Sequence, residues 1–180
     1  GTRALNLALQ AVLNPPATGK REKKHGDFSF REGDRVMQIK NDYDIIWQKE
    51  DGAVGTGVFN GDVGTITEID PSGELVTVLF DDRMATYTTE MLPELELAYA
   101  VTVHKAQGSE YRAVILAALE GAPMLMTRGV LYTAITRARE LFIIVGDQGT
   151  VAQMVANDRQ TRRYSGLRAR LAEGSWTRNE

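Results

Sequence analysis

The chain has 180 residues, of which 43% are apolar and 25% charged, and this balance is typical of a folded globular protein rather than a disordered one. Its net charge of −3 argues against a nucleic-acid binder that works through overall positive charge. Cysteine is absent, which excludes disulfide scaffolds and thiolate metal sites, and two histidines are too few for a conventional histidine zinc site.

The apolar runs are too short to cross a bilayer, and the first residues lack the long apolar region of a signal peptide. We therefore expect a cytoplasmic protein with no membrane contact. The N-terminus also lacks an initiator methionine, so the chain is expected to be a piece of a longer protein.

Residues 1–45 predict a helix, a loop and a strand. Apolar residues recur at helical spacing over 4–13, and Asn14-Pro15-Pro16 ends the helix. The Lys-rich segment 17–27 is interpreted as a solvated connector. Gly33-Asp34 then introduces a strand over 35–40.

The segment between Asn41 and Pro93 is rich in glycine and has strong turn signals at Asn60-Gly61 and at 70–73. Three stretches have the composition of strands: Asp62–Ile69, Leu75–Phe80 and Ala85–Glu90. Short strands joined by tight turns predict a small, strongly bent β-barrel of the SH3 kind.

After Pro93 the pattern returns to alternating strands and helices, which indicates an α/β architecture. Strands are expected over 97–103, 113–117 and 141–145, the last two as buried parallel strands. Helices are expected over 125–140, near 150–158 and over 160–172, with a frayed end at 174–180.

Two arginines stand inside an otherwise apolar stretch. On the expected helix the buried stripe consists of Leu131, Ala134, Ile135 and Ala138. Arg137 lies at one edge of this stripe and Arg139 on the opposite flank. From the spacing alone, Arg137 is either an edge arginine that extends into solvent or a rigidly held ligand for an anion.

A polar turn over 104–110 follows the expected strand that ends at Val103. Ligands gather at the ends of strands in open α/β sheets, and Gly108 allows close approach of the backbone. Gln107, Ser109 and Glu110 supply donors and acceptors. Taken by itself, the segment is either a binding turn or an ordinary capped polar loop.

Together the two segments resemble a known family. TVHKAQGSEY (102–111) followed by LYTAITRARELFIIVG (131–146) resembles motifs V and VI of superfamily 1 helicases, in order and in separation. The chain is similar to the RecD-like branch, which includes exodeoxyribonuclease V alpha subunits and the helicase parts of conjugative relaxases. The stretches 5–15, 30–44 and 57–66 fit the same branch, so the resemblance covers almost the whole chain.

The resemblance implies a fold and a nucleotide site. Residues 1–45 and 95–180 would form the second RecA-like motor domain, an α/β parallel-sheet domain of the P-loop NTPase type without the P-loop, and 46–94 an SH3-like barrel inserted into it. ATP would lie between this domain and an N-terminal RecA-like domain. Arg137 matches the arginine that reaches the γ-phosphate, Gln107 and Gly108 match the turn near the phosphates, and Glu110 matches a carboxylate near the nucleotide sugar.

The resemblance also implies a path for single-stranded DNA. Thr102 and His104 match positions that touch the DNA backbone, and Asn41 is a candidate for contact with DNA or with a neighbouring domain. On the inserted barrel Phe59, Asn60 and Tyr87 could present a stacking or polar surface to a base or sugar. Asn60 is the candidate DNA contact among them, core packing is the favoured role for Phe59, and Tyr87 is left undecided.

Other basic residues are expected to have structural roles. Arg139 is assigned to a structural role, for which an ion pair is one form. The arginine-rich end of the chain is interpreted as a solvated helix face, with phosphate contacts as the alternative; its members are Arg159, Arg162, Arg163, Arg168 and Arg170.

The sequence lacks the residues that hold Mg²⁺ and the phosphates in such motors. Gly19-Lys20 has Asn14 in place of the first Walker A glycine and Arg21 in place of Thr or Ser, and no Asp-Glu pair occurs. The phosphate-binding loop and the Mg²⁺ ligands are therefore expected on a missing N-terminal half. We expect the segment to fold alone but neither to hydrolyse ATP nor to unwind DNA. Two alternatives stay open: the helicase part of a relaxase, or an SH3-containing adaptor.

The 5′→3′ direction of translocation follows from the resemblance alone. Whether the parent protein works with subunits of a nuclease complex stays unspecified.

Overall fold

The computed structural model describes residues 1–119, 121–122 and 124–159. The chain divides into two compact units, which are Gly1–Gly108 and the described residues from Ser109 onward. The expected helix over 160–172, the frayed end at 174–180 and the arginines 162, 163, 168 and 170 lie outside the described residues. No helix in the described part of the chain has the length and apolar character needed to cross a membrane.

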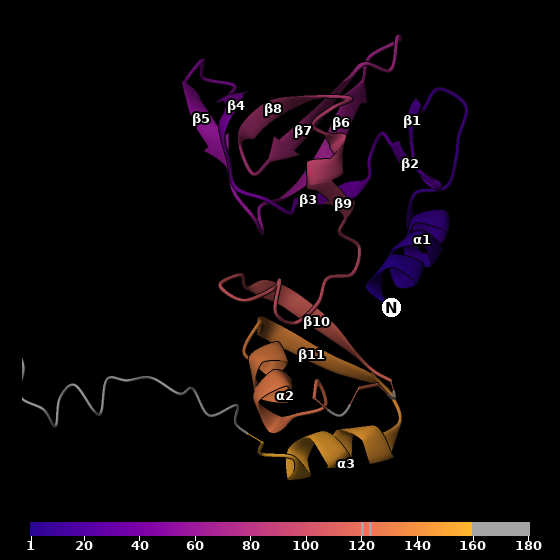
Figure 1. Ribbon diagram of the computed structural model, residues 1–180, viewed down its shortest axis with the longest axis vertical. Coiled ribbons are helices and arrows are strands. Elements are labelled where there is room, and N and C mark those ends of the chain that lie inside the picture. Colours follow the sequence, from indigo (N-terminus) through magenta and orange to yellow (C-terminus); the bar gives the residue numbers. More distant parts are fainter. Residues whose placement is uncertain (120, 123, 160–180) are drawn as a thin grey trace, which may run out of the picture. The chain divides into compact units, whose positions relative to one another are not determined.

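The first unit consists of one helix and nine strands among the described residues (Figure 1). Its elements are α1 (Thr2–Leu13), β1 (Glu22–His25), β2 (Phe28–Arg31), β3 (Arg35–Gln38), β4 (Asp42–Gln48), β5 (Val54–Val58), β6 (Val63–Ile69), β7 (Leu75–Phe80), β8 (Arg83–Thr88), a 3₁₀ turn (Leu92–Glu94) and β9 (Leu95–Leu97). The helix expected over 4–13 and the strands expected near 35–40, 62–69, 75–80 and 85–90 are confirmed.

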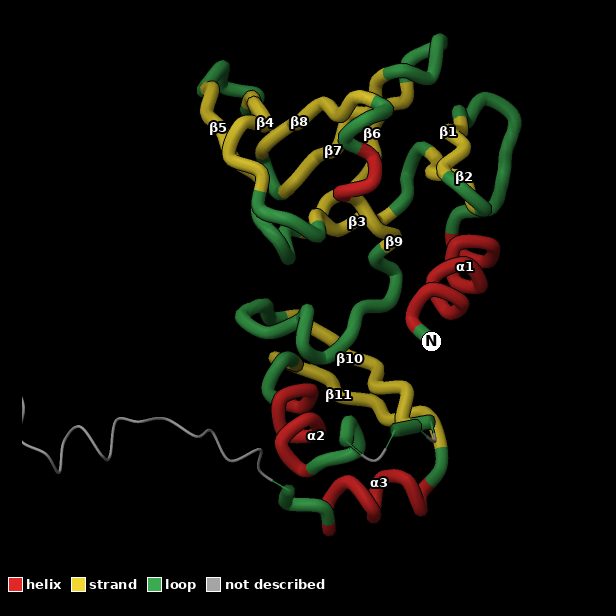
Figure 2. Tube along the Cα trace, in the orientation of Figure 1, coloured by secondary structure: helices red, strands yellow, loops and turns green. Residues whose placement is uncertain are grey.

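A curved antiparallel sheet forms the body of this unit (Figure 2). Its seven strands are ordered β5-β4-β8-β7-β6-β3-β9. Alternation along β7 sends Val76, Val78 and Phe80 into the core, where each is at most 1% exposed. The sheet draws β3 and β9 from outside the segment 46–94, and the domain boundaries at 45 and 94 stay a prediction.

The segment 17–27, expected to be a loop, contains a strand. Residues 22–25 pair with 28–31 in an antiparallel hairpin, and Gly26 occupies the left-handed region of φ in its turn. The rings of His25 and Phe28 have centroids 5.6 Å apart, so the hairpin is held by aromatic contacts as well as by its ladder. The charged sequence Glu-Lys-Lys-His carries no alternation that indicates a strand.

The second unit consists of β10 (Tyr111–Ala118), α2 (Arg128–Ile135), β11 (Ala138–Gly146) and α3 (Gln148–Ala156) among the described residues. β10 and β11 form a parallel pair, α2 packs on both strands and α3 packs against α2. The parallel pairing and the helix near 150–158 were expected, but the strands are not buried. Ile115 is 67% exposed and Val145 is 55% exposed.

The helix expected over 125–140 is shorter than the sequence indicates. Thr127 caps its start by accepting a hydrogen bond from the Val130 amide, and the helix ends at Ile135. Pairing of Tyr111 with Ala138 draws the following residues into β11. Arg139 therefore stands on a strand, and the helical wheel that placed it on a helix flank was wrong.

The strand expected over 97–103 is also wrong, because β9 ends at Leu97 and turns follow from 103 to 108. The side chain of Asn6 explains part of this difference. Its amide donates to the carbonyl of Ala100 and accepts from the amide of Ala100, both at 2.8 Å. The backbone of Ala100 is thereby bonded to α1 instead of to a neighbouring strand.

A buried carboxylate joins the helix, the hairpin and the sheet of the first unit. Asp34 is 0% exposed and its two oxygens accept four hydrogen bonds. The donors are the Gln10 amide at 2.6 Å, the Asn14 amide at 2.7 Å, the Arg31 backbone N–H at 2.8 Å and the Tyr99 hydroxyl at 2.8 Å. Each oxygen receives two donors, so the full acceptor capacity of the carboxylate is in use.

Asp34→Asn is expected to destabilise the chain by about 3 kcal/mol, because the new amide nitrogen would face two donors and leave them unsatisfied. Urea unfolding followed by tryptophan fluorescence measures this change. Asp44→Asn is the control, since Asp44 is exposed and its carboxylate accepts no hydrogen bond from another described residue. Equal free energies of unfolding for the two variants would contradict the role given to Asp34.

Tyr99 gives this network a pH dependence. Burial, and then the hydrogen bond to Asp34, raise the pKa of Tyr99 from 10.0 to about 12. Because the folded-state pKa is the higher one, the contribution of Tyr99 to stability is present below pH 10 and is lost as the pH rises toward 12. The wild type should therefore lose more stability over this window than Tyr99→Phe, as measured by urea unfolding at each pH. Parallel curves would refute this assignment.

Candidate nucleotide and nucleic-acid site

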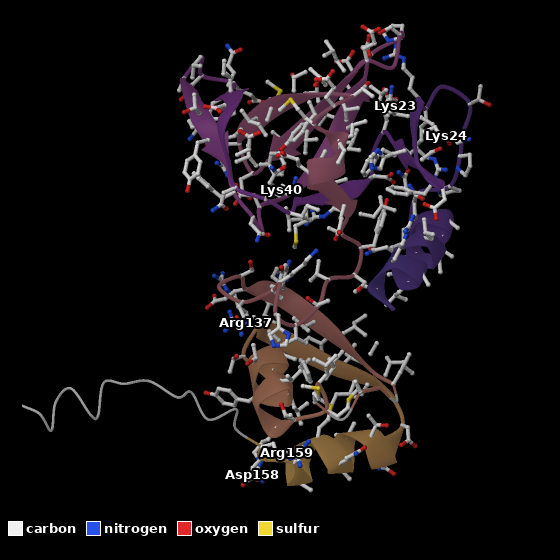
Figure 3. The ribbon with its side chains drawn as sticks, viewed as in Figure 1. Lys23, Lys24, Lys40, Arg137, Asp158 and Arg159 are labelled. Carbon is white, nitrogen blue, oxygen red and sulfur yellow. The ribbon has the colours of Figure 1, made fainter. Side chains whose placement is uncertain are left out.

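The guanidinium of Arg137 is held by oxygen atoms that carry no formal charge. It donates to the carbonyl of Ser109 at 3.0 Å, to the carbonyl of Thr133 at 3.3 Å and to the hydroxyl of Thr136 at 3.3 Å. The backbone joins the same segments, because the Tyr111 amide donates to the Arg137 carbonyl at 2.8 Å. Arg137 (labelled in Figure 3) is half-buried and forms no ion pair with any described residue.

The neighbouring arginine has a different environment. Arg139 donates to the carboxylate of Glu110 at 2.7 Å, so the ion pair named as one form of its structural role is present. Both side chains are exposed, so the pair adds little to stability. Arg112 likewise pairs with Glu140 at 3.0 Å. Glu110, expected near a nucleotide sugar, is in this structure the partner of Arg139, and its role at the sugar stays a prediction.

The other motif residues form consecutive turns at the end of the first unit. The Ala106 amide donates to the Thr102 carbonyl at 3.1 Å, and the Gln107 amide donates to the His104 carbonyl at 3.2 Å. His104, Gln107 and Gly108 are exposed. Gly108 has a φ of +89°, a conformation that favours glycine. The turn therefore presents polar groups to solvent at residues 102–108.

Thr102 also lines a cavity of about 480 Å³ inside the first unit. Lys105 stands at the same cavity, where it pairs with Glu96 at 2.7 Å. Most of the remaining lining is apolar or comes from α1 and the tip of the β1–β2 hairpin. Thr102 and Lys105 thus bring one hydroxyl and one cation to the rim of a mainly apolar hollow.

Asn41 and Asn60 are brought together, although they lie nineteen positions apart in the chain. Asn41 precedes β4 and Asn60 follows β5, and these strands pair with Asp42 opposite Val58. The Asn60 amide donates to Oδ1 of Asn41 at 2.9 Å. The two predicted DNA contacts therefore share one corner of the sheet.

The structure decides the place of Tyr87, which was left open, and differs from expectation at Phe59. Tyr87 is 0% exposed and its hydroxyl donates to Oε1 of Gln38 at 2.9 Å, so it packs in the core. Burial raises the pKa of the Tyr87 phenol above its ordinary range. Phe59, expected in the core, is 40% exposed. Sequence reasoning missed Tyr43, whose position between two aspartates beside Asn41 was the available signal.

One described side chain in the motif segments suits an anionic ligand. A cation held by neutral oxygens, as Arg137 is, suits a phosphate group. Among the described residues no group of three or more His, Asp or Glu side chains has an arrangement suited to a metal ion, so no Mg²⁺ ligand is assigned here.

Two family models match the chain. The one described as the SH3 domain of ATP-dependent RecD-like DNA helicases matches residues 5–80. The one described as a UvrD-like helicase C-terminal domain matches residues 97–145. The first covers most of α1 and most of the curved sheet, and the second covers residues 102–111 and all but the last residue of 131–146.

Curated relatives agree with these models. The ATP-dependent RecD2 DNA helicase of Deinococcus radiodurans is 35% identical over 162 residues, which are 90% of this chain and 20% of that protein. The RecBCD enzyme subunit RecD of Mycobacterium tuberculosis is 35% identical over 117 residues, 65% of this chain and 20% of that protein. The corresponding subunit of Mycolicibacterium smegmatis is 32% identical over 143 residues, 79% of this chain and 23% of that protein. The chain thus spans about a fifth of the length of these relatives.

Proposed function

We propose, from the premise that this chain belongs to the RecD-like DNA helicases, that it is a C-terminal motor segment of an ATP-dependent 5′→3′ DNA helicase. In this proposal the segment supplies one side of the ATP site and part of the path for single-stranded DNA. An N-terminal RecA-like domain of the same protein supplies the phosphate-binding loop and the Mg²⁺ ligands.

The observation that carries the proposal is that the guanidinium of Arg137 has hydrogen-bond partners but no ion-pair partner among the described residues. Ion pairs neutralise Arg112 and Arg139, whereas the hydrogen bonds of Arg137 go to carbonyl and hydroxyl oxygens. Its positive charge is therefore not compensated by a carboxylate among the described residues. Bonds to Ser109 and Thr133 fix the guanidinium without neutralising it, so little reorganisation is needed when it meets an anion.

The role proposed for Arg137 comes from the helicase motif that it matches, and this preorganisation supports it. ATP, bound with Mg²⁺, supplies the phosphoryl group whose transfer to water releases the free energy for movement. Arg137 binds an oxygen of the terminal phosphate and stabilises the negative charge that develops there. Gln107 and Gly108 are proposed to lie near the phosphates, and Glu110 near the sugar.

Two groups of residues are proposed to contact the DNA strand. Thr102 and His104 lie on the same run of turns as Gln107, so the nucleotide turn and one strand contact are continuous in the chain. Asn41 and Asn60 form the second group, at the corner of the SH3-like sheet.

The second unit is proposed to be part of a RecA-like sheet. β10 and β11 are parallel, and parallel sheets are normally covered on both faces. The apolar side chains that β10 and β11 expose, among them Ile115, Ile144 and Val145, support further strands and helices around this pair in the intact protein.

Replacement of Arg137 by Ala in the intact helicase should lower DNA-stimulated ATP turnover by about 10³-fold, because arginines at such positions contribute rate factors of this size. Affinity for single-stranded DNA should stay nearly unchanged. Arg112→Ala is the control and should retain most of the turnover, since it removes only the exposed ion pair with Glu140. If the two variants hydrolyse ATP at the wild-type rate, Arg137 has no part in the reaction.

The 180-residue chain by itself should bind no Mg²⁺-ATP productively and release no phosphate, with or without DNA. The sequence contains neither Gly-x-x-x-x-Gly-Lys-Ser/Thr nor an Asp-Glu pair. A coupled assay for free phosphate measures this, with the intact helicase as the positive control. Sustained, DNA-stimulated turnover by the chain would refute the proposal.

A further inference from the structure

We propose that Tyr43 and Phe59 form a stacking site for the bases of single-stranded DNA. This inference rests on the proposed function for the identity of the ligand and adds the residues and the mode of contact. The site lies at the corner where β4 begins and β5 ends, and a T-shaped contact joins the two rings, whose centroids are 5.5 Å apart.

A β-bulge turns Tyr43 outward. Asp42 pairs with Val58 and Ile46 pairs with Thr56, so β4 carries two more residues than β5 between these pairs. In a regular strand residues 43 and 45 would face the same side. Here Ile45 is 3% exposed in the core, whereas Tyr43 is 66% exposed. The bulge therefore separates one core residue from one surface ring.

The backbone of the β5 turn holds Phe59 beside Tyr43. Gly57 has a φ of +95°, and a Cβ at this position would lie 2.9 Å from the Phe59 ring. Because Gly57 has no side chain, the Phe59 ring can pack against the backbone at this position. The Phe59 amide also donates to Oδ2 of Asp62 at 3.1 Å, and the Asp62 amide donates to the Phe59 carbonyl at 2.9 Å. The ring is therefore on a fixed turn while 40% of the residue is exposed.

Polar groups suited to a nucleotide surround the rings. Oδ1 of Asn41 is bonded to the Asn60 backbone, but Nδ2 of Asn41 and the side-chain amide of Asn60 have no hydrogen-bond partner in the part of the chain that the structure describes. These groups can bond to a base edge or a phosphate oxygen. Lys40, which Figure 3 labels, is exposed and forms no ion pair with a described residue.

The charges at this corner favour a single strand over a duplex. Asp42 and Asp44 flank Tyr43 in sequence, and Asp62 is engaged by Arg83 at 3.3 Å and by the Phe59 amide. One free lysine beside two aspartates does not attract two phosphate backbones. Exposed aromatic faces with free amides instead suit unpaired bases, because stacking needs no net charge.

The test measures binding of the folded 180-residue chain to a fluorescent thymidine oligonucleotide, to the same length of abasic deoxyribose phosphate, and to a duplex. Tyr43→Ala should weaken binding to the thymidine strand about tenfold, in line with the loss of one stacked base. Tyr43→Phe should retain the affinity, and Phe59→Ala should weaken it. Tyr132→Ala is the control, because Tyr132 is 68% exposed in the other unit.

The base-dependent part of the affinity is the decisive quantity. Tyr43→Ala should lower the preference for the thymidine strand over the abasic strand and leave the salt dependence of binding unchanged, since no phosphate contact is removed. Ring protons of Tyr43 should also shift upfield in the NMR spectrum when the oligonucleotide is added to the wild type. Equal loss of affinity for thymidine and abasic strands would overturn stacking in favour of a structural effect.

Three further outcomes would also overturn the inference. They are wild-type affinity of Tyr43→Ala, tighter binding to duplex than to single strand, and a change of self-association in sedimentation without a change in DNA binding, which would make the corner an interface between copies of the chain. None of these outcomes bears on the ATP turnover of Arg137→Ala, so failure of this inference and failure of the proposed nucleotide site are distinguishable.

Discussion

The first unit depends on one buried carboxylate. Asp34 accepts hydrogen bonds from α1, from β2 and from Tyr99, while its own backbone carbonyl accepts from the Ile66 amide on β6 at 2.9 Å. Among the described residues no cation lies within ion-pair distance of Asp34. Hydrogen bonds from neutral donors therefore offset the whole desolvation cost of burying its carboxylate. Four segments must be in place at once for this group to be satisfied. The network therefore fixes the position of α1 against the sheet more narrowly than apolar contact would.

The helix α1 shows the consequence. Asn6 and Gln10 are its buried residues, and the buried Asn14 follows at the same four-residue interval as its C-cap; each bonds to backbone or to Asp34. The apolar residues that predicted the helix face outward in part, since Val12 and Leu13 are 76% and 64% exposed. Apolar spacing gave the correct element and boundaries but not the face that packs. A polar stripe of amides at the same spacing carried that information.

Strands and helices whose apolar residues alternate or recur at helical spacing can be predicted from the sequence. Elements whose ends depend on pairing with a distant strand cannot. β6 and β7 were predictable because their apolar residues alternate toward a core. The end of α2 was not, because Ala-Arg-Glu-Leu favours a helix as much as a strand, and the pairing of Ala138 with Tyr111 selects the strand. Arg139 was nevertheless assigned to a structural role, and an ion pair is present. Tyr43 was missed because a bulge sets its direction, and its place between two aspartates was the one sequence feature that indicated exposure.

The two units differ in how completely they bury their apolar surface. The first has a core of fourteen buried apolar residues around its curved sheet. In the described part of the second, only Ala118, Leu131, Ala134 and Met154 are buried apolar residues, while β10 and β11 expose isoleucine and valine side chains. A two-stranded parallel pair is not stable with its apolar surface in water. The expectation that the whole segment folds alone therefore applies with physical support to residues 1–108. The described residues of the second unit contain no comparable core, so for residues 109–159 the same expectation stays a prediction.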